Sequence, residues 1–209
     1  WIGKKEDRPN FDYPVVDLNN ACVLPGFVDA HMHPVMLADF SKEISALPPK
    51  VNSIADLIKE IKLKANQMKK DKKDGWILGW GYDEGKFAEK RSITRWDLDE
   101  GTTDFPVSII RTCAHIRCVN SKALALAGIT KDTKDPEGGH IERDEFGEPT
   151  GVLEENARNL VLPYIPELNE AEQVQNLVDL GDLLTSQGIV AVCDMGNLDK
   201  YDNYNYYKE

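Results

Sequence analysis

The stretch VLPGFVDAHMHP at residues 23–34 carries two histidines, His31 and His33, one residue apart at the end of an apolar segment. Residues i and i+2 of a strand point to the same face, so we expect the two imidazoles side by side. A Pro-Gly turn precedes the strand, Phe27 and Val28 are expected to bury it, and a proline ends it after the second histidine. The pattern predicts half of a metal site at the carboxyl end of a buried strand, where barrel and open α/β enzymes carry out their chemistry.

The residues alone leave two interpretations of this segment open. An H-x-H pair occurs in metal sites and also at solvent-exposed strand ends that bind nothing. Asp29 lies two residues before His31 and shares its strand face, where it either orients a histidine or caps a loop.

The composition indicates a soluble globular chain that is smaller than a complete barrel enzyme. The 209 residues are 41% hydrophobic and contain no apolar run near the roughly 18 residues that span a bilayer. A (β/α)8 barrel takes about 250 residues, so we expect a fragment of a larger enzyme. The net charge of −11 argues against nucleic acid and anionic membrane as partners. The four cysteines lack C-x-x-C spacing, which favours reduced thiols in a cytoplasmic protein.

Hydrophobic periodicity and capping residues predict alternating helices and strands along the rest of the chain. Ser53 with Asp56 resembles a capping box at one helix start, and Asn169 with Glu172 begins another helix. The glycines of the strand at 76–82 are expected at a bulge or beside a close neighbour. The predicted helices cover 54–68, 121–127 and 169–187, and the predicted strands cover 27–33, 76–82, 107–112, 140–143 and 189–194.

The order of these elements predicts an α/β fold in which a barrel is interrupted by an insertion. A strand at 27–33 is followed by a long structured excursion before the next buried, parallel-type strand at 189–194. Connections in a barrel normally take a few residues, so the excursion is expected to cover the site. We expect barrel strand 1 within residues 1–38, an inserted α/β domain at 39–160, and a helix with barrel strand 2 at 161–209. The fold class is an α/β insert domain plus the first strands of an incomplete (β/α)8 metal-hydrolase barrel.

Six ordered motifs resemble the amidohydrolase superfamily, in particular the amidohydrolase-3 type, which includes N-substituted formamide deformylase-like proteins. The resemblance covers nearly the whole chain, and the strand-one pattern Asp-x-His-x-His is its most specific part. The chain departs from the pattern at Ala114, where related sequences tend to have glycine, and at Cys193, where they more often have histidine. The motifs are PGFVDAHMHP at 25–34, WILGWGYDE at 76–84, TRWDLDE at 94–100, PVSIIRTCAHIRCVNSKAL at 106–124, DPEGGHIERDEFGEPTGVLEENA at 135–157 and GIVAVCDMG at 188–196.

The resemblance implies a metal-dependent hydrolase of C–N bonds in amides, formamides or cyclic amides. His31 and His33 would hold one or two divalent ions, with zinc as the first expectation, and the ion would activate a water molecule. The remaining ligands and the catalytic aspartate lie on later barrel strands in that family. No catalytic residue is therefore expected within this chain, and the chain alone is expected to be inactive because catalytic zinc takes three protein ligands.

The resemblance also suggests substrate-binding residues, each with a structural alternative. His115 and Arg111 fall in a segment placed over the barrel mouth, where His115 contacts a substrate carbonyl or else belongs to a loop hydrogen-bond network. Trp80, Tyr82 and Asp83 either bind an apolar amide-like substrate or belong to the core of the insert.

Five further residues have a first interpretation that is structural. Cys193 is a soft metal ligand or, more simply, a core residue. The adjacent carboxylates Glu154 and Glu155 are expected at a helix start, where the dipole favours them. Trp96, with Asp97, is expected to anchor a loop between strands of the insert.

Two other functions remain open at this point. One is a non-catalytic α/β module for packing, dimerisation or substrate capture, and the other is a parent protein that acts as a deaminase of the same superfamily. Strands without their barrel neighbours expose edges and apolar faces, so we expect a homo-oligomer.

Overall fold

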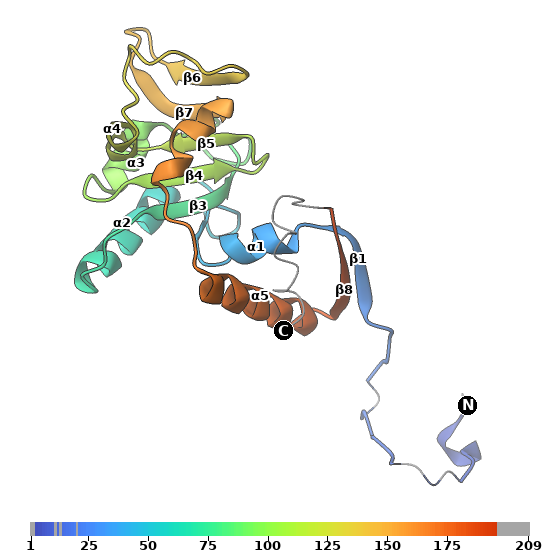
Figure 1. Ribbon diagram of the computed structural model, residues 1–209. Helices are drawn as coiled ribbons and strands as arrows, with labels where there is room; N and C mark the ends of the chain where they lie inside the picture. Colours follow the sequence, from blue (N-terminus) through green and yellow to red (C-terminus); the bar gives the residue numbers. More distant parts are fainter. Residues whose placement is uncertain (1–2, 11, 13, 20, 196–209) are drawn as a thin grey trace.

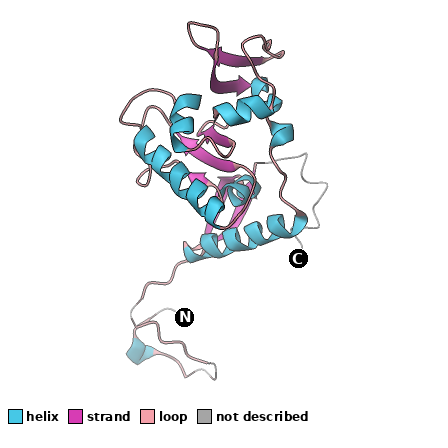
Figure 2. Cartoon of the chain, turned by 90° about the vertical axis from the view of Figure 1, so that its left-hand side faces the viewer, coloured by secondary structure: helices cyan, strands magenta, loops and turns pink. Residues whose placement is uncertain are grey.

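The computed structural model describes residues 3–10, 12, 14–19 and 21–195. The segment before the first strand contains one short 3-10 helix, η1 (Lys5–Asp7), and extends away from the packed elements (Figure 1, Figure 2). Within the described ranges, no helix is long and apolar enough to cross a membrane. The end of the predicted segment 161–209, from residue 196 on, lies outside the described residues, as does the last residue of the motif at 188–196.

A six-stranded mixed sheet forms the larger body of the structure. Its strand order is β2-β3-β4-β5-β7-β6, with parallel pairing from β2 to β4 and antiparallel pairing from β4 to β6. The α/β fold class is confirmed. The strands are β2 (Ile44–Ser45), β3 (Ile77–Tyr82), β4 (Val107–Arg111), β5 (Ile116–Val119), β6 (Gly139–Arg143) and β7 (Pro149–Glu155).

Two apolar clusters stabilise this sheet. The larger one packs α2 (Ile54–Lys70) and α3 (Arg95–Gly101) against strand residues such as Ile109 and Cys118. The smaller one joins Val119 to α4 (Ser121–Leu126) and to the 3-10 helix η2 (Asn156–Leu160), which η3 (Leu162–Tyr164) follows. Cys118 and Val119 are neighbours in β5 yet belong to different clusters, because successive residues of a strand point to opposite faces.

A separate two-stranded parallel sheet carries the histidine motif. It pairs β1 (Phe27–Met32) with β8 (Ile189–Asp194), and the pairing runs from Phe27 opposite Ile189 to Met32 opposite Asp194. Figure 1 shows these strands side by side, apart from the six-stranded sheet. Helix α1 (Pro34–Phe40) follows β1 and packs against α5 (Glu170–Ser186), which leads into β8. Both strands were predicted, and so was the parallel type of β8.

The predicted burial of these two strands is wrong, whereas the exposed apolar faces expected of strands without their barrel neighbours are found. Val28 and Val190 are each 66% exposed, and Phe27 is also exposed. A parallel strand is buried when neighbouring strands and helices cover both of its faces. In the described part of the chain, β1 and β8 have only each other as strand partners, so their side chains remain in contact with solvent.

The glycines of β3 occupy the positions that the sequence predicts for them. A Cβ atom on Gly79 would lie 2.8 Å from the Ile44 carbonyl oxygen of the adjacent strand. Gly81 has φ +92°, and the register between β3 and β4 shifts between Trp80 and Tyr82. This irregularity puts Tyr82 in the core although Trp80, two residues earlier, faces the other side of the sheet.

The local helix signals are confirmed, whereas two segments differ from prediction. Ser53 Oγ accepts the backbone N–H of Asp56 at 3.0 Å, and Asn169 forms a capping box with Glu172. Trp96 and Asp97 lie in the helix α3 and not in a loop, because Asp97 caps that helix and pairs with a neighbouring arginine.

Glu154 and Glu155 end strand β7, and Glu155 is also the N-cap of the 3-10 helix η2, so the expected helix start holds for Glu155 whereas Glu154 lies in a strand. The backbone of Glu154 pairs with β5 and β6, so both neighbouring strands hold it extended.

Two half-buried ionisable groups, Glu43 after α1 and Arg117 in β5, influence each other electrostatically. Glu43 follows α1, and its Oε2 is shielded from solvent without a hydrogen-bond partner among the described residues. Burial raises the pKa of Glu43 to about 7, Arg117 opposes this shift, and Asp39 adds to it. Burial likewise lowers the pKa of Arg117 to about 10, and Arg117 Nη1 donates to Ser108 Oγ at 2.6 Å. For both partners, desolvation outweighs the attraction between the two charges.

Replacement of a core leucine in α2 is expected to destabilise the fold. Leu57 is fully buried, so Leu57→Ala should lower the free energy of unfolding by about 2–5 kcal/mol through the cavity it leaves. Leu63 lies on the same helix and is 55% exposed, so Leu63→Ala should cost less than about 0.5 kcal/mol. Urea denaturation measures both values. Equal costs for the two substitutions would contradict the packing described for α2.

The pKa of Glu43 predicts a specific pH dependence of stability. The unfolded carboxyl loses its proton near pH 4.5 and the folded one near pH 7, so the free energy of unfolding should fall as the pH rises between these values. The loss attributable to this group is up to about 3 kcal/mol.

Glu43→Gln cannot titrate, and it should match the wild type at pH 4.5 and exceed its stability above pH 7. Denaturant titrations at pH 4.5 to 8 measure this difference. The exposed Glu145→Gln is the matched control and should leave the difference flat. A flat difference for Glu43→Gln as well would show that Glu43 does not have this shifted pKa.

Candidate metal centre

Two imidazoles meet where β1 ends and α1 begins. His31 lies in β1, and His33 occupies the position before the first residue of α1. Their ring centroids are 5.6 Å apart, with the ring planes nearly perpendicular at 88°. Two imidazoles bound to one zinc ion, each at about 2.1 Å through a nitrogen, hold their ring centroids about 5–6 Å apart. The donor type and the ring separation therefore both fit a shared metal ion.

Backbone hydrogen bonds hold the two histidines at this junction. The N–H of Met195 donates to the Met32 carbonyl at 3.0 Å, and the N–H of Leu37 donates to the His33 carbonyl at 3.0 Å. The first bond belongs to the β1–β8 pairing and the second to the first turn of α1. His33 therefore lies at a fixed change of direction, with strand on one side and helix on the other.

Asp29 braces the backbone of the motif. Its Oδ1 accepts the backbone N–H of His31 at 3.0 Å, which is the hydrogen bond of a local cap. The structure thus favours the capping alternative for Asp29, because the bond goes to the main chain of His31 and not to its ring.

The described residues supply two ligands of a larger site. No group of three or more His, Cys, Asp or Glu side chains comes together to hold a metal ion in the part of the chain that the structure describes. Cys193 is exposed in β8 and joins no such group there. Catalytic zinc ordinarily takes three protein ligands, so His31 and His33 form a partial site.

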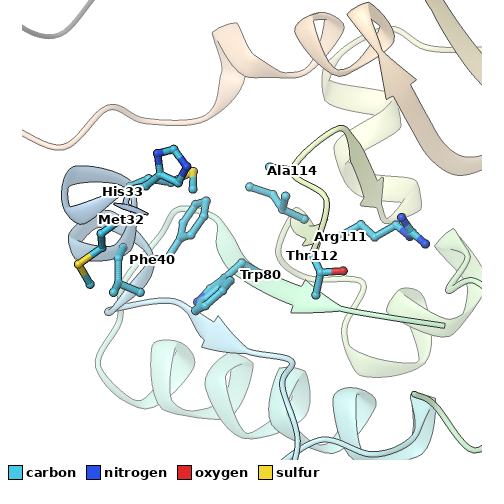
Figure 3. Close-up of a pocket in the computed structure, with 10 residues that line it drawn as sticks. Met32, His33, Phe40, Trp80, Arg111, Thr112 and Ala114 are labelled. Carbon is cyan, nitrogen blue, oxygen red and sulfur yellow. The ribbon is translucent and has the colours of Figure 1, made fainter. Parts of the chain in front are cut away.

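A cavity of about 140 Å³ opens beside His33, between α1 and the ends of β3 and β4. Figure 3 shows His33 and Met32 on one side of it and Thr112 and Ala114 on the other. Trp80 stacks on Phe40 with ring centroids 5.3 Å apart and an interplanar angle of 20°. The apolar lining residues from the helix and strands are Met32, Met36, Leu37, Phe40, Trp80 and Ile110.

The structure separates the residues that the sequence groups as substrate-binding. Trp80 lines the cavity, but Tyr82 is fully buried and packs near Phe87, so the expectation that Tyr82 contacts substrate is wrong. The reason is the bulge at Gly81, which turns Tyr82 to the opposite face. Asp83 does not line the cavity, and its Oδ1 accepts the N–H of Gly85 at 2.9 Å within a turn.

Arg111 contributes its stem to the cavity while its guanidinium is bound elsewhere. The guanidinium makes a two-pronged contact with Glu84, with Nη2–Oε1 at 2.6 Å and Nε–Oε2 at 2.8 Å. This pairing lowers the pKa of Glu84 and raises the pKa of Arg111. In Figure 3 the charged end of Arg111 points away from His33. Arg111 therefore shapes the wall of the cavity and keeps its charge outside it.

His115 lies next to the cavity in a hydrogen-bonded loop. Its Nδ1 is 3.0 Å from Glu155 Oε2, and its carbonyl accepts the N–H of Glu155 at 2.9 Å. His115 therefore belongs to a hydrogen-bond network within the loop, which is the structural alternative considered for it. Its contact with a substrate stays a prediction. Ala114, which lines the cavity, has φ +60°, a left-handed conformation that glycine adopts more easily. The departure from glycine at this position thus falls on strained backbone.

Two residues of this region, Phe40 and Glu43, do not stand out in the sequence. Phe40 is the last residue of a short helix whose pattern PVMLADF resembles an apolar loop as much as a helix. Glu43 has the composition of a surface residue, and its partner Arg117 is distant in sequence. The sequence signal for Phe40 is the apolar run that directly follows His33, which indicates an apolar surface beside the histidine pair.

Comparison with known proteins agrees with this arrangement. A family model described as "Amidohydrolase family" matches residues 14–209. The chain is 36% identical over 155 residues to the putative amidohydrolase YtcJ of Bacillus subtilis, covering 74% of this chain and 28% of that protein. It is 33% identical over 150 residues to N-substituted formamide deformylase of Arthrobacter pascens, covering 72% of this chain and 27% of that enzyme.

A solved structure of a metal-dependent hydrolase is also similar to this chain. An uncharacterized metal-dependent hydrolase from Pyrococcus horikoshii OT3 superposes with a TM-score of 0.50 at 27% identity, over 80% of this chain and 30% of that one. The chain thus spans less than a third of the length of these three relatives. The family match covers nearly all of it, and the chain belongs to the amidohydrolase family.

Proposed function

We propose that this chain forms part of a metal-dependent hydrolase that cleaves C–N bonds of amides, formamides or cyclic amides. The observation that carries the proposal is the pair of imidazoles 5.6 Å apart, one of which lines a cavity, in a member of the amidohydrolase family. The similarity to N-substituted formamide deformylase supports a C–N bond as the target.

The residues of this chain have distinct roles in the proposed reaction. His31 and His33 hold a divalent ion, with zinc the first candidate because imidazole nitrogen suits it. When bound, such an ion supplies an activated water near neutral pH and polarises a carbonyl. Phe40 and Trp80 exclude bulk solvent on one side of the site, which strengthens electrostatic interactions there.

Part of the proposed site comes from other regions of the protein. We propose that further metal ligands, and the carboxylate that transfers a proton to the leaving nitrogen, lie beyond the described residues. The proposal that other ligands lie elsewhere is motivated by the incomplete ligand set among the described residues, where His31 and His33 supply two ligands. The isolated chain would then bind metal and hydrolyse substrate poorly.

Metal titration tests the proposed site directly. The double variant His31→Ala with His33→Ala is expected to lose zinc affinity by at least about tenfold, because both imidazole donors are removed. Isothermal titration calorimetry at neutral pH measures the affinity of each protein.

His140→Ala is the matched control, since His140 is an exposed histidine of β6 that contacts Asp135 at 2.7 Å away from the pair. Its zinc affinity should equal that of the wild type. Unchanged affinity in the double variant would refute the proposed metal site.

We further propose that the chain forms a homo-oligomer through its two-stranded sheet. Val28 and Val190 expose apolar side chains on β1 and β8, and such surfaces favour association. Light scattering across a concentration series should show dimers, and Val28→Lys with Val190→Lys should shift the population to monomer. A wild-type monomer at every concentration would contradict this expectation.

A further inference from the structure

Strand β6 lies at one end of the six-stranded sheet, with β7 as its single strand neighbour in the described part of the chain (Figure 1). Successive residues of an antiparallel strand direct their main-chain groups to alternate sides, so half of these groups in β6 face away from β7. Unpaired N–H and C=O groups on such an edge can pair with a strand of another molecule. The loop at 130–138, which precedes β6, decides whether this edge is open.

The loop covers the edge of β6 without forming a strand of its own. Asp135 Oδ1 accepts the N–H of Ile141 at 3.3 Å, and the Ile141 carbonyl accepts a hydrogen bond from Arg143 Nη1 at 2.7 Å. The N–H of Gly139 donates to the Pro136 carbonyl at 3.0 Å. Two charged side chains therefore occupy both main-chain groups of Ile141, in the middle of the strand, where a neighbouring strand would otherwise bind.

Asp135 connects the parts of this cover. Its Oδ1 also accepts Arg143 Nη1 at 2.8 Å, and its Oδ2 lies 2.7 Å from His140 Nδ1. Arg143 Nη2 donates to the Thr133 carbonyl, which ties the guanidinium to the loop. Hydrogen bonds from Arg143 and His140 lower the pKa of Asp135 to about 2, so this carboxylate stays ionised at neutral pH. Loss of the one carboxylate would release the Ile141 N–H and both of these side chains.

The sequence of β6 is complementary to a second copy of itself. Ile141 is buried in the smaller apolar cluster, and the side chains of His140 and Glu142 lie on the other face of the strand. Two β6 strands paired antiparallel about a two-fold axis at Ile141 would place His140 of each copy opposite Glu142 of the other. An imidazole can donate a hydrogen bond to a carboxylate, and such cross-strand pairs stabilise antiparallel strands. This complementarity, present twice in the pair, favours a second copy as the partner.

We propose that the edge of β6 is a surface that pairs with the same edge of a second copy, and that Asp135 and Arg143 keep it closed. In the wild type, these two side chains hold the main-chain groups of Ile141 that the pairing requires. Removal of either side chain opens the edge and lets one sheet continue across two molecules. The surface is distinct from the two-stranded sheet of β1 and β8, and its pairing requires no metal ion.

Asp135→Ala and Arg143→Ala test the proposal in the full chain carrying Val28→Lys and Val190→Lys, so that apolar association through β1 and β8 does not contribute. Analytical ultracentrifugation across a concentration series measures the average mass. Each variant should raise this mass above that of the background protein at equal concentration and toward its dimer. Asp132→Ala is the matched control, because Asp132 is an exposed carboxylate of the same loop that takes no part in the cover. This control should leave the mass unchanged.

Charge changes at His140 test the register of the pairing. Combined with Asp135→Ala, His140→Glu would put a carboxylate opposite Glu142 of the second copy at both positions, and it should weaken association about tenfold or more. His140→Lys keeps opposite charges there and should retain the association of Asp135→Ala. Equal association of these two double variants would overturn the self-pairing of β6.

Hydrogen exchange of individual amides locates the surface and also tests the cover in the wild type. The wild-type Ile141 amide should be protected although it faces no strand. At low concentration, Asp135→Ala should speed its exchange about fivefold or more, because one acceptor is lost, and at high concentration the second copy should slow it again.

Three results would overturn the proposal. The first is a wild-type Ile141 amide that exchanges as fast as a fully exposed one, which tests the cover even if the variants fold poorly. The second is unchanged mass in both Asp135→Ala and Arg143→Ala while their circular dichroism matches that of the background protein. The third is association whose new protection falls on β1 and β8 and leaves β6 unprotected.

Discussion

The proline that follows the second histidine constrains everything around the site. Pro34 has no N–H to donate to a neighbouring strand, and its fixed φ suits the first position of a helix. The chain therefore leaves the β1–β8 pairing at His33 and turns into α1. Because α1 packs against α5 and supplies Phe40 to the cavity, the same turn brings a candidate metal ligand and an aromatic wall together.

Glu43 and Arg117 interact electrostatically between the segment after α1 and the six-stranded sheet, and burial costs both groups part of their hydration. Two apolar residues of similar volume would avoid the desolvation that shifts both pKa values. Glu43 follows α1 and Arg117 lies in β5, and the attraction between their charges offsets only part of the loss of hydration. Ser108 completes part of the hydrogen bonding of Arg117.

The sequence predicted those features whose signal is local. The helix caps at Ser53 and Asn169, the strands β1 and β8, and the special positions of the β3 glycines all follow from residues close together in the chain. The candidate site was predictable for the same reason, because His31 and His33 are two residues apart and this spacing brings their rings together.

The features that the sequence did not predict depend on distant neighbours or on a single inserted residue. The apolar pattern of Val28 and Val190 predicts burial, which requires strands on both sides; only the length of the chain, and not the pattern itself, indicates that these neighbours are lacking among the described residues. Tyr82 belongs to the core, which is the alternative to substrate binding that the sequence leaves open, because the bulge at Gly81 places it on the other face from Trp80. Glu43 acquires its unusual proton affinity from burial, against the opposing charge of Arg117, and neither the burial nor Arg117 is visible in its own segment.

The pairing of β1 with β8 also bears on the order in which the molecule forms. Residues 33–188 lie between the two strands, so their contact closes a very long loop, whereas neighbouring strands of the six-stranded sheet close short ones. Loop closure costs entropy before any contact compensates for it. The intervening sheet can assemble from nearby segments first and bring the two distant strands within reach. The β1–β8 pairing, which includes the hydrogen bond to the Met32 carbonyl between the two histidines, would then form late, after the six-stranded sheet.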